Sequence, residues 1–216
     1  MKRPLLLGHR GARASDGVPE NTLESFELCL QHGCDGFEFD VRRSADGDAL
    51  VCHDPAVRGL TIERTLAADL ELPTLNEVLA VFAARAFLDI ELKVAGLEAQ
   101  VVSLLRERRP AKGYLVSSFL PQVLTDLHTL DPVIPLGFLC EDRTELNRWL
   151  TMPVEWVVPR VDLVDSQMIE TMRASGKKVL PWTVNQVDEM RTLVEWGVDA
   201  MITDDTVLGP RTLGTF

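Results

Sequence analysis

The chain has 216 residues, of which 46% are hydrophobic and 25% charged, and its 33 acidic against 22 basic residues give a formal net charge of −11. This length suits one large domain or two small ones, and the apolar fraction excludes a mainly disordered chain. The acidic excess argues against nucleic acid and anionic membrane surfaces as partners, because both attract faces rich in Lys and Arg. An anionic substrate would need local positive charge to overcome the overall field.

The cysteines and the N-terminal segment indicate the compartment. Cys29, Cys34, Cys52 and Cys140 show no zinc-like spacing and are too sparse for a disulfide scaffold, so we interpret them as free, buried thiols. The apolar run Leu5–Leu7 is shorter than the ~7–15 residues of a signal-peptide core. No apolar stretch approaches the ~20 residues of a membrane span. We expect a soluble, cytoplasmic protein without stable membrane insertion.

Short β-like runs recur along the chain, and segments with helical spacing lie between most of them. In residues 23–30, for example, apolar residues fall at i, i+3, i+5 and i+7. The predicted strands are Leu5–Gly8, Gly36–Val41, Ala86–Leu92, Tyr114–Ser118, Pro135–Leu139, Trp156–Arg160, Lys178–Trp182 and Ala200–Thr203.

Signals for helix ends agree with this pattern. Thr74 opens a capping box, and Asn21 and Asn185 each precede a periodic stretch with an acid three residues on. Three glycines follow predicted helices and precede predicted strands: Gly33, Gly176 and Gly197.

Eight strands alternating with helices predict a parallel sheet with helical crossovers. The number eight favours a closed (β/α)8 TIM barrel over an open doubly wound sheet, which would also carry a G-x-G-x-x-G after its first strand. A leucine-rich repeat is excluded because its fixed L-x-x-L-x-L skeleton is missing. We expect one domain over residues 1–216.

About fifty residues separate the start of the second predicted strand from that of the third, more than separate any other two consecutive predicted strands. The turn at Asp46–Asp48 predicts a hairpin that extends the second strand, followed by a loop over residues 55–72 and a helix over Thr74–Arg85. We interpret residues 44–72 as a hairpin and loop inserted over the C-terminal mouth of the barrel.

Charged residues alternate with apolar ones along two of the strands. Glu38 and Asp40 are two residues apart and point to one face, and Asp89, Glu91 and Lys93 do the same on the third strand. In a parallel barrel both faces of the sheet are covered, so these charges form a buried ion-pair network or a site. Four of them fall at the C-terminal strand ends, where barrel enzymes place catalytic groups: Glu38, Asp40, Glu91 and Lys93.

Three converging carboxylates do not all stay charged in a confined space without a cation. Their hard oxygen ligands suit Mg²⁺ or Ca²⁺ better than zinc. The alternative is a structural network in which Lys93 and Arg10 neutralise the acids.

Two of the four histidines belong to the predicted mouth. His9 ends the first strand and His53 lies in the hairpin after the second, so both are placed for general acid/base work. His32 and His128 lie at predicted helix C-termini, where compensation of the helix dipole explains them. No serine nucleophile elbow, Walker A loop or HExxH motif is present. The set predicts metal-assisted hydrolysis of a phosphodiester.

The same residues resemble the glycerophosphodiester phosphodiesterase family. The matching motifs are His9–Ala12, Pro19–Thr22, Glu38–Asp40, Asp46–Gly47 with Val51 and His53–Asp54, Leu72–Leu75, Glu91–Lys93, Trp182–Asn185 and Gly197–Asp204. They occur in order and span residues 8–204, which makes a chance match very improbable.

The resemblance implies a TIM barrel that hydrolyses glycerophosphodiesters, such as glycerophosphocholine or glycerophosphoethanolamine, to sn-glycerol 3-phosphate and an alcohol. It assigns one divalent metal ion, Mg²⁺ or Ca²⁺, and leaves open the order of the two histidines and the choice between a cyclic-phosphate intermediate and direct attack by water. The implied site comprises His9 and His53 as acid and base, Glu38, Asp40 and Glu91 as metal ligands, Arg10 and Lys93 on the phosphate, and Trp182 in the substrate pocket.

Glu20 and Asn21 would support the site, although a helix cap explains Asn21 equally well, and a barrel-core position is the alternative for Trp182. The chain departs from the family pattern in a rim segment, Ala12–Val18, that is about two residues longer than usual. The loop after His53 is short, as in the compact, cytoplasmic type.

Two other functions are the alternatives, one close and one remote. A lysophospholipase D would use the same chemistry with an apolar groove, to which Phe119, Phe138 and Trp182 would contribute. An inactive binding module would lack a histidine or a metal carboxylate, and none is missing. The expected partner is a small-molecule phosphodiester, and the oligomeric state is left open.

Overall fold

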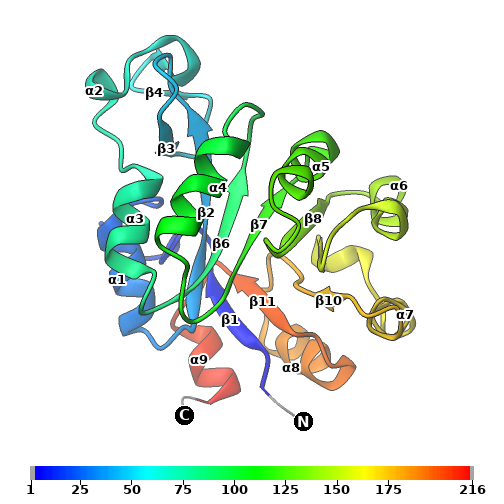
Figure 1. The fold of residues 1–216 in the computed structure, drawn as a ribbon. Coiled ribbons are helices and arrows are strands. Elements are labelled where there is room, and N and C mark those ends of the chain that lie inside the picture. Colours follow the sequence, from blue (N-terminus) through cyan, green and yellow to red (C-terminus); the bar gives the residue numbers. More distant parts are fainter. Residues whose placement is uncertain (1–2, 215–216) are drawn as a thin grey trace.

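The computed structural model describes residues 3–214, which form a parallel α/β barrel surrounded by helices (Figure 1). The barrel strands are β1 (Leu5–Gly8), β2 (Gly36–Arg43), β6 (Phe87–Leu92), β7 (Tyr114–Ser118), β8 (Leu136–Cys140), β9 (Trp156–Pro159), β10 (Lys178–Val179) and β11 (Ala200–Thr203). The order around the sheet is β10-β9-β8-β7-β6-β2-β1-β11, with parallel pairing between neighbours. The predicted (β/α)8 class is confirmed.

Helices follow the barrel strands and cover the outside of the sheet (Figure 1). They are α1 (Leu23–Gln31), α3 (Leu75–Phe82), α4 (Glu98–Glu107), α5 (Pro121–Leu130), α6 (Arg143–Leu146), α7 (Ser166–Ala174), α8 (Val187–Trp196) and α9 (Leu208–Leu213), with the short 3-10 helices η2 (Asn147–Thr151) and η3 (Val161–Leu163).

The outward face of β2 shows why the helices pack there. Phe37 stacks on Phe26 of α1 with ring centroids 4.2 Å apart, and Phe82 of α3 meets Phe37 edge-on at 5.1 Å. Phe39 belongs to the same buried cluster. Because side chains alternate along a strand, Glu38 and Asp40 point to the opposite, inner face, as predicted.

The barrel closes less regularly than the sequence predicts. The seventh strand was expected over Lys178–Trp182, but its ladder with β9 covers only Lys178–Val179, with a single further bridge at Trp182. Beyond the ladder, Leu180 N still donates to Val157 O and Trp182 N to Pro159 O, both at 3.0 Å, whereas Pro181, which has no backbone N–H, faces β11. Between β10 and β11, Asp199 N donates to Val179 O and Ile202 N donates to Pro181 O, both at 3.0 Å. These bonds make the barrel nearly closed.

The predicted hairpin after β2 is present, because β3 (Ala49–Val51) pairs with β2 in antiparallel register. Residues 55–72 were expected to be a loop, and that expectation is wrong. They fold into a second hairpin of β4 (Ala56–Val57) and β5 (Leu60–Thr61), then η1 (Ile62–Arg64) and α2 (Ala67–Leu70). A small apolar cluster of Leu50, Ile62 and Leu70 supports them, and pattern reasoning misses elements this short.

Some of the polar residues predicted to cap helices do so, and others do not. Thr74 and Glu77 form the predicted capping box, and the helix after it ends at Phe82 rather than Arg85. Asn21 and Asn185 are not caps. The N-cap of α1 is Thr22, whose side chain accepts from Ser25 N, and α8 has no side-chain cap.

The cysteines are free, as predicted, but Cys52 is only half-buried whereas Cys29, Cys34 and Cys140 are buried.

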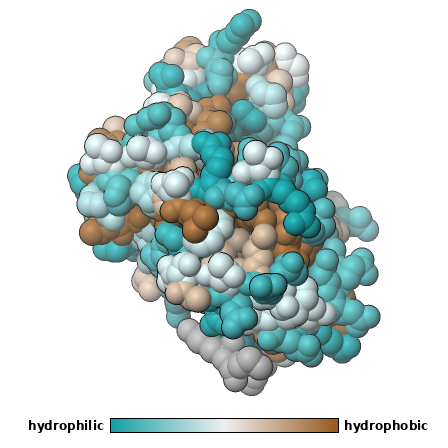
Figure 2. Space-filling view, turned by 90° about the vertical axis from the view of Figure 1, so that its right-hand side faces the viewer, coloured by the Kyte–Doolittle hydropathy of each residue, from teal (hydrophilic) through white to brown (hydrophobic). Residues whose placement is uncertain are grey.

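Among residues 3–214 no helix is long and apolar enough to span a membrane. On the side of the molecule in Figure 2, hydrophilic residues cover most of the surface and apolar ones appear as separate patches.

A glycine fixes the approach of β2 to β6. A Cβ added to Gly36 would clash with the backbone carbonyl oxygen of Phe87, its register partner. We predict that Gly36→Ala lowers the free energy of unfolding by about 3 kcal/mol, because the backbone of a neighbouring strand does not yield as a side chain does. Gly176→Ala, with φ of +78° and open space, should cost only about 1 kcal/mol. Equal losses in urea unfolding would contradict this account.

Candidate active site

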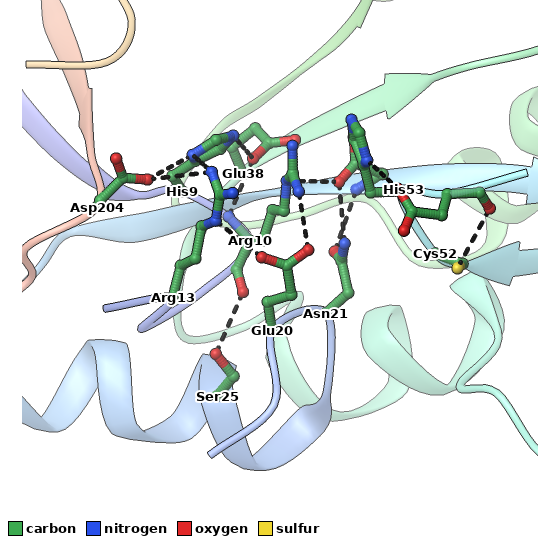
Figure 3. Close-up of polar contacts among 12 residues, drawn as sticks. His9, Arg10, Arg13, Glu20, Asn21, Ser25, Glu38, Cys52, His53 and Asp204 are labelled. Atoms are coloured by element: carbon green, nitrogen blue, oxygen red, sulfur yellow. Dashed lines mark hydrogen bonds and ion pairs between the residues drawn. The ribbon is translucent and has the colours of Figure 1, made fainter. Parts of the chain in front are cut away.

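A cavity of about 460 Å³ opens at the C-terminal ends of the barrel strands. The residues that line it come from both halves of the chain, which the closure of the sheet brings together. Seven predicted site residues are in the lining: His9, Arg10, Glu38, His53, Glu91, Lys93 and Trp182. Asp40 is buried behind it, whereas Glu20 and Asn21 contact the lining from the loop before α1. Figure 3 shows most of these contacts.

The three predicted metal carboxylates converge. Each of Glu38, Asp40 and Glu91 offers an oxygen, and these oxygens lie within 4.8 Å of one another. The pairing of β2 with β6 places Asp40 opposite Glu91, which explains their approach. Burial and then the charge of Asp40 raise the pKa of Glu38 well above its usual range and that of Glu91 to about 7. Ionisation of the whole cluster is therefore energetically unfavourable.

Two cations offset this charge in part. Lys93 Nζ lies 2.6 Å from Glu91 Oε1 and 3.3 Å from Asp40 Oδ1, and Arg10 Nε lies 3.2 Å from Asp40 Oδ2. Although burial opposes it, the charge of Lys93, the hydrogen bond from Asn21 and the charge of Arg10 lower the pKa of Asp40.

The hydrogen bonding of the two Glu38 oxygens distinguishes a structural ion-pair network from a metal site. Its Oε2 accepts from Arg10 N at 3.0 Å, but its buried Oε1 has no hydrogen-bond partner among residues 3–214. A purely structural network would satisfy this oxygen. An all-carboxylate set with an unpartnered oxygen fits a hard divalent cation, so Glu38, Asp40 and Glu91 would be its ligands.

His9 is held by a carboxylate that sequence reasoning gave no role. His9 Nδ1 lies 2.7 Å from Asp204 Oδ1 (Figure 3), and Asn185 Nδ2 donates to Asp204 Oδ2 at 2.7 Å. Against the effect of burial, the hydrogen bonds from His9 and Asn185 lower the pKa of Asp204 to about 2. An ionised Asp204 keeps the proton of His9 on Nδ1 and leaves Nε2 free on the cavity side.

His53 has a similar arrangement on a more exposed side chain. Its Nδ1 lies 2.8 Å from Asp54 Oδ1, and its backbone carbonyl accepts from Arg42 Nε at 2.6 Å. The His53 side chain is 34% exposed against 13% for His9. Both imidazoles therefore present Nε2, one in an enclosed and one in an open position.

The loop before α1 holds Arg10 in place. Arg10 NH1 donates to Glu20 Oε1 at 2.8 Å, and Asn21 N donates to Arg10 O at 3.0 Å. Asn21 Nδ2 also donates to Asp40 Oδ2 at 2.9 Å, which explains why Asn21 does not cap the helix. Arg10 and Asn21 both have φ above +50°, so this loop turns tightly toward the cluster.

The remaining lining is partly apolar. Trp182 borders the cavity, and its Nε1 donates to Val158 O at 3.0 Å, so the ring is not simply part of the barrel core. It meets Phe119 edge-on at 5.7 Å. Arg13 and Glu141 also line the cavity and were not predicted, since nothing in their local sequence distinguishes them from ordinary loop residues.

Asp89 occupies the layer below the cavity. It is fully buried and accepts a hydrogen bond from Ser117 Oγ at 2.6 Å. Burial raises the pKa of Asp89 to about 8, so this carboxyl is protonated at neutral pH and adds little charge to the cluster. The three charges predicted for the third strand thus divide into one neutral acid and the pair of Glu91 and Lys93.

A family model for the glycerophosphoryl diester phosphodiesterase family matches residues 9–94 and 88–208, which include every predicted site residue. The chain belongs to the glycerophosphoryl diester phosphodiesterase family. Membership in this family makes the protein an enzyme of the phosphoric diester hydrolase class.

Similar proteins match over nearly their whole length. The chain is 29% identical to a glycerophosphodiester phosphodiesterase of Caldanaerobacter subterraneus subsp. tengcongensis, over 98% of this chain and 96% of that one. It is 28% identical to a phosphodiesterase structure from Oleispira antarctica in complex with the product sn-glycerol-3-phosphate, with a TM-score of 0.86 and coverage of 97% and 96%. A glycerophosphodiester phosphodiesterase structure from Thermotoga maritima shares the fold, with a TM-score of 0.84 at 24% identity and coverage of 98% and 99%.

The carboxylate cluster predicts cation binding by the folded protein. We expect Mg²⁺ or Ca²⁺ to raise the Tm of chelator-treated protein, because a ligand at a hundred times its Kd stabilises the native state by about 2.7 kcal/mol. Glu38→Gln should remove most of this shift, whereas Glu195→Gln, on an exposed position of α8, should retain it. An unchanged shift in Glu38→Gln, measured by differential scanning calorimetry, would exclude Glu38 as a ligand.

Proposed function

We propose that this enzyme hydrolyses glycerophosphodiesters such as glycerophosphocholine or glycerophosphoethanolamine to sn-glycerol 3-phosphate and the free alcohol. The observation that carries the proposal is the geometry of one cavity, in which two carboxylate-held histidines meet an acidic cluster, the buried Arg10 and the partly buried Lys93. The product complex of the Oleispira antarctica relative supports the identity of the product.

In this mechanism His9 and His53 move the protons. One histidine takes a proton from the attacking hydroxyl group or water, and the other donates a proton to the departing alcohol oxygen. Each uses Nε2, because its Nδ1 is engaged by Asp204 or by Asp54. His9 is less exposed than His53, so His9 would transfer its proton on the enclosed side of the phosphate.

Arg10 and Lys93 would bind the phosphate. Both line the cavity, and their ion pairs with Asp40 and Glu91 set the direction of each side chain. Against the effect of burial, the neighbouring carboxylates raise the pKa of Lys93, so it stays charged when it faces the substrate. Positive charge fixed beside the phosphoryl oxygens stabilises the charge that develops on them during hydrolysis.

Glu38, Asp40 and Glu91 would hold the divalent metal. When bound, Mg²⁺ or Ca²⁺ supplies Lewis-acid polarisation of a phosphoryl oxygen. Trp182 would line the pocket for the alcohol, and Glu20 and Asn21 would fix Arg10 and Asp40.

A lysophospholipase D has weaker support. Of the three aromatic residues considered for an apolar groove, Phe138 is fully buried in the core and only Phe119 and Trp182 border the cavity. The lining around them is rich in charge, which disfavours a long acyl chain.

Removal of either histidine tests the proton transfers. We predict that His9→Ala and His53→Ala each lower kcat for glycerophosphocholine by about 10²-fold or more, as is typical for loss of an acid or base. The matched control is His128→Ala, an exposed residue near the end of α5, which should keep kcat within twofold. Wild-type kcat in His9→Ala or in His53→Ala, with an unchanged circular dichroism spectrum, would remove that residue from the mechanism.

Chelation tests the metal independently of the histidines. EDTA should abolish release of sn-glycerol 3-phosphate from glycerophosphocholine, and Mg²⁺ or Ca²⁺ should restore it after the chelator is removed. Comparison of the two ions over a concentration series identifies the one that works at lower concentration. Full activity in excess chelator would contradict the metal assignment.

A further inference from the structure

The cations and the acidic cluster of the cavity lie on one arc of the barrel, and its aromatic residues and Glu141 lie on the other. The cations Arg10, Arg13 and Lys93 follow β1 and β6, two strands that both border β2. On the other side, Phe119 and Glu141 directly follow β7 and β8. Trp182 follows β10, beyond β9, and so belongs to that second arc. A ligand that spans both arcs places one end beside Arg10 and Lys93 and the other end beside Glu141 and the aromatic residues.

Glu141 gives the second arc its charge. Its side chain is exposed in the cavity wall and forms no ion pair or hydrogen bond with another side chain of residues 3–214. Its backbone N donates to Glu145 Oε2 at 3.1 Å, which fixes the start of this loop. The nearby cation Arg160 is engaged elsewhere, because its Nε and NH2 donate to the two oxygens of Asp162 at 2.6 and 3.0 Å. The Glu141 carboxylate is therefore available to a ligand.

The two aromatic side chains add a surface that attracts cations. Phe119 and Trp182 meet at 83° with ring centroids 5.7 Å apart, and the hydrogen bond to Val158 O fixes the Trp182 ring. Lys93 Nζ lies 5.6 Å from the centroid of Phe119, within the distance at which an aromatic ring attracts a cation. Aromatic faces with a nearby carboxylate recognise ammonium groups, including quaternary ones that donate no hydrogen bond.

We infer that Glu141, together with Phe119 and Trp182, selects phosphodiesters whose alcohol is positively charged over those whose alcohol is a neutral polyol. This inference rests on the proposed function. In the proposed orientation the phosphate binds Arg10 and Lys93, and the alcohol rather than the glycerol extends toward Glu141 and the aromatic residues, which line the same cavity. An amino alcohol then places its ammonium group beside a free carboxylate, whereas a polyol gains no charge interaction there.

The test compares two diesters that release the same phosphate product. We would measure kcat/KM for glycerophosphocholine and for glycerophosphoinositol by coupled detection of sn-glycerol 3-phosphate. In the wild-type protein the choline diester should be preferred, and Glu141→Gln should reduce that preference about fivefold, as expected for one partly exposed charge pair. The loss should fall on KM for the choline diester, and the constants for the inositol diester should not change.

A matched control removes the same charge elsewhere. Glu170→Gln, at an exposed position of α7 outside the cavity, should leave the ratio of the two kcat/KM values at its wild-type level. Glu141→Lys should lower the ratio further, and added salt should lower it in the wild type but not in Glu141→Gln.

The outcomes separate this inference from the proposed function. If the wild type hydrolyses both diesters and Glu141→Gln leaves their ratio unchanged, the role of Glu141 is wrong and the proposed function stands. If the wild type releases sn-glycerol 3-phosphate from neither diester, the proposed function is wrong and the inference fails with it. A wild-type preference for the inositol diester would also overturn the inference.

Discussion

The convergence of three carboxylates inside the barrel is the constraint on which the site depends. Register between β2 and β6 brings Asp40 beside Glu91, and strand alternation brings Glu38 to the same inner face. Such a cluster is unfavourable alone, because burial and mutual repulsion oppose its ionisation. Lys93 and Arg10 compensate Asp40 and Glu91, but no side chain of residues 3–214 reaches Glu38 Oε1. The fold thus holds a buried carboxylate oxygen that a further cation would satisfy.

The histidines show how the rest of the site is arranged around this cluster. His9 lies 3.9 Å from Glu38 through Nε2, while its Nδ1 is fixed by Asp204 from the opposite end of the chain. The carboxylate of Asp204 is in turn held by Asn185. A proton on Nδ1 and a free Nε2 are what a proton-transfer catalyst needs, and closure of the barrel between β1 and β11 supplies both.

The site was largely predictable from the sequence because strand alternation and the C-terminal strand ends are local features. Glu38, Asp40, Glu91 and Lys93 follow from them directly. The partner of His9 was not predictable, since Asp204 is 195 residues away. The contact of Asn21 was not predictable either. A polar residue before a helix is typical of an N-cap, but a backbone φ of +58° turns the Asn21 amide toward Asp40 instead. Short elements such as β4, β5 and η1 carry too little periodicity to predict.

The net charge of −11 appeared to oppose any anionic substrate, but the cavity shows that charge acts there by position rather than by sum. Arg10, Lys93 and Arg13 lie beside the acidic cluster on one arc of the mouth, and Glu141 places a carboxylate on the other. A bound phosphodiester feels mainly the charges of the cavity, because the Debye length is about 8 Å at physiological ionic strength and more distant charges are screened. With a cationic alcohol the two arcs favour one orientation and oppose its reverse. The orientation decides which oxygen leaves, so the same charge separation that would select the alcohol would also direct the cleavage.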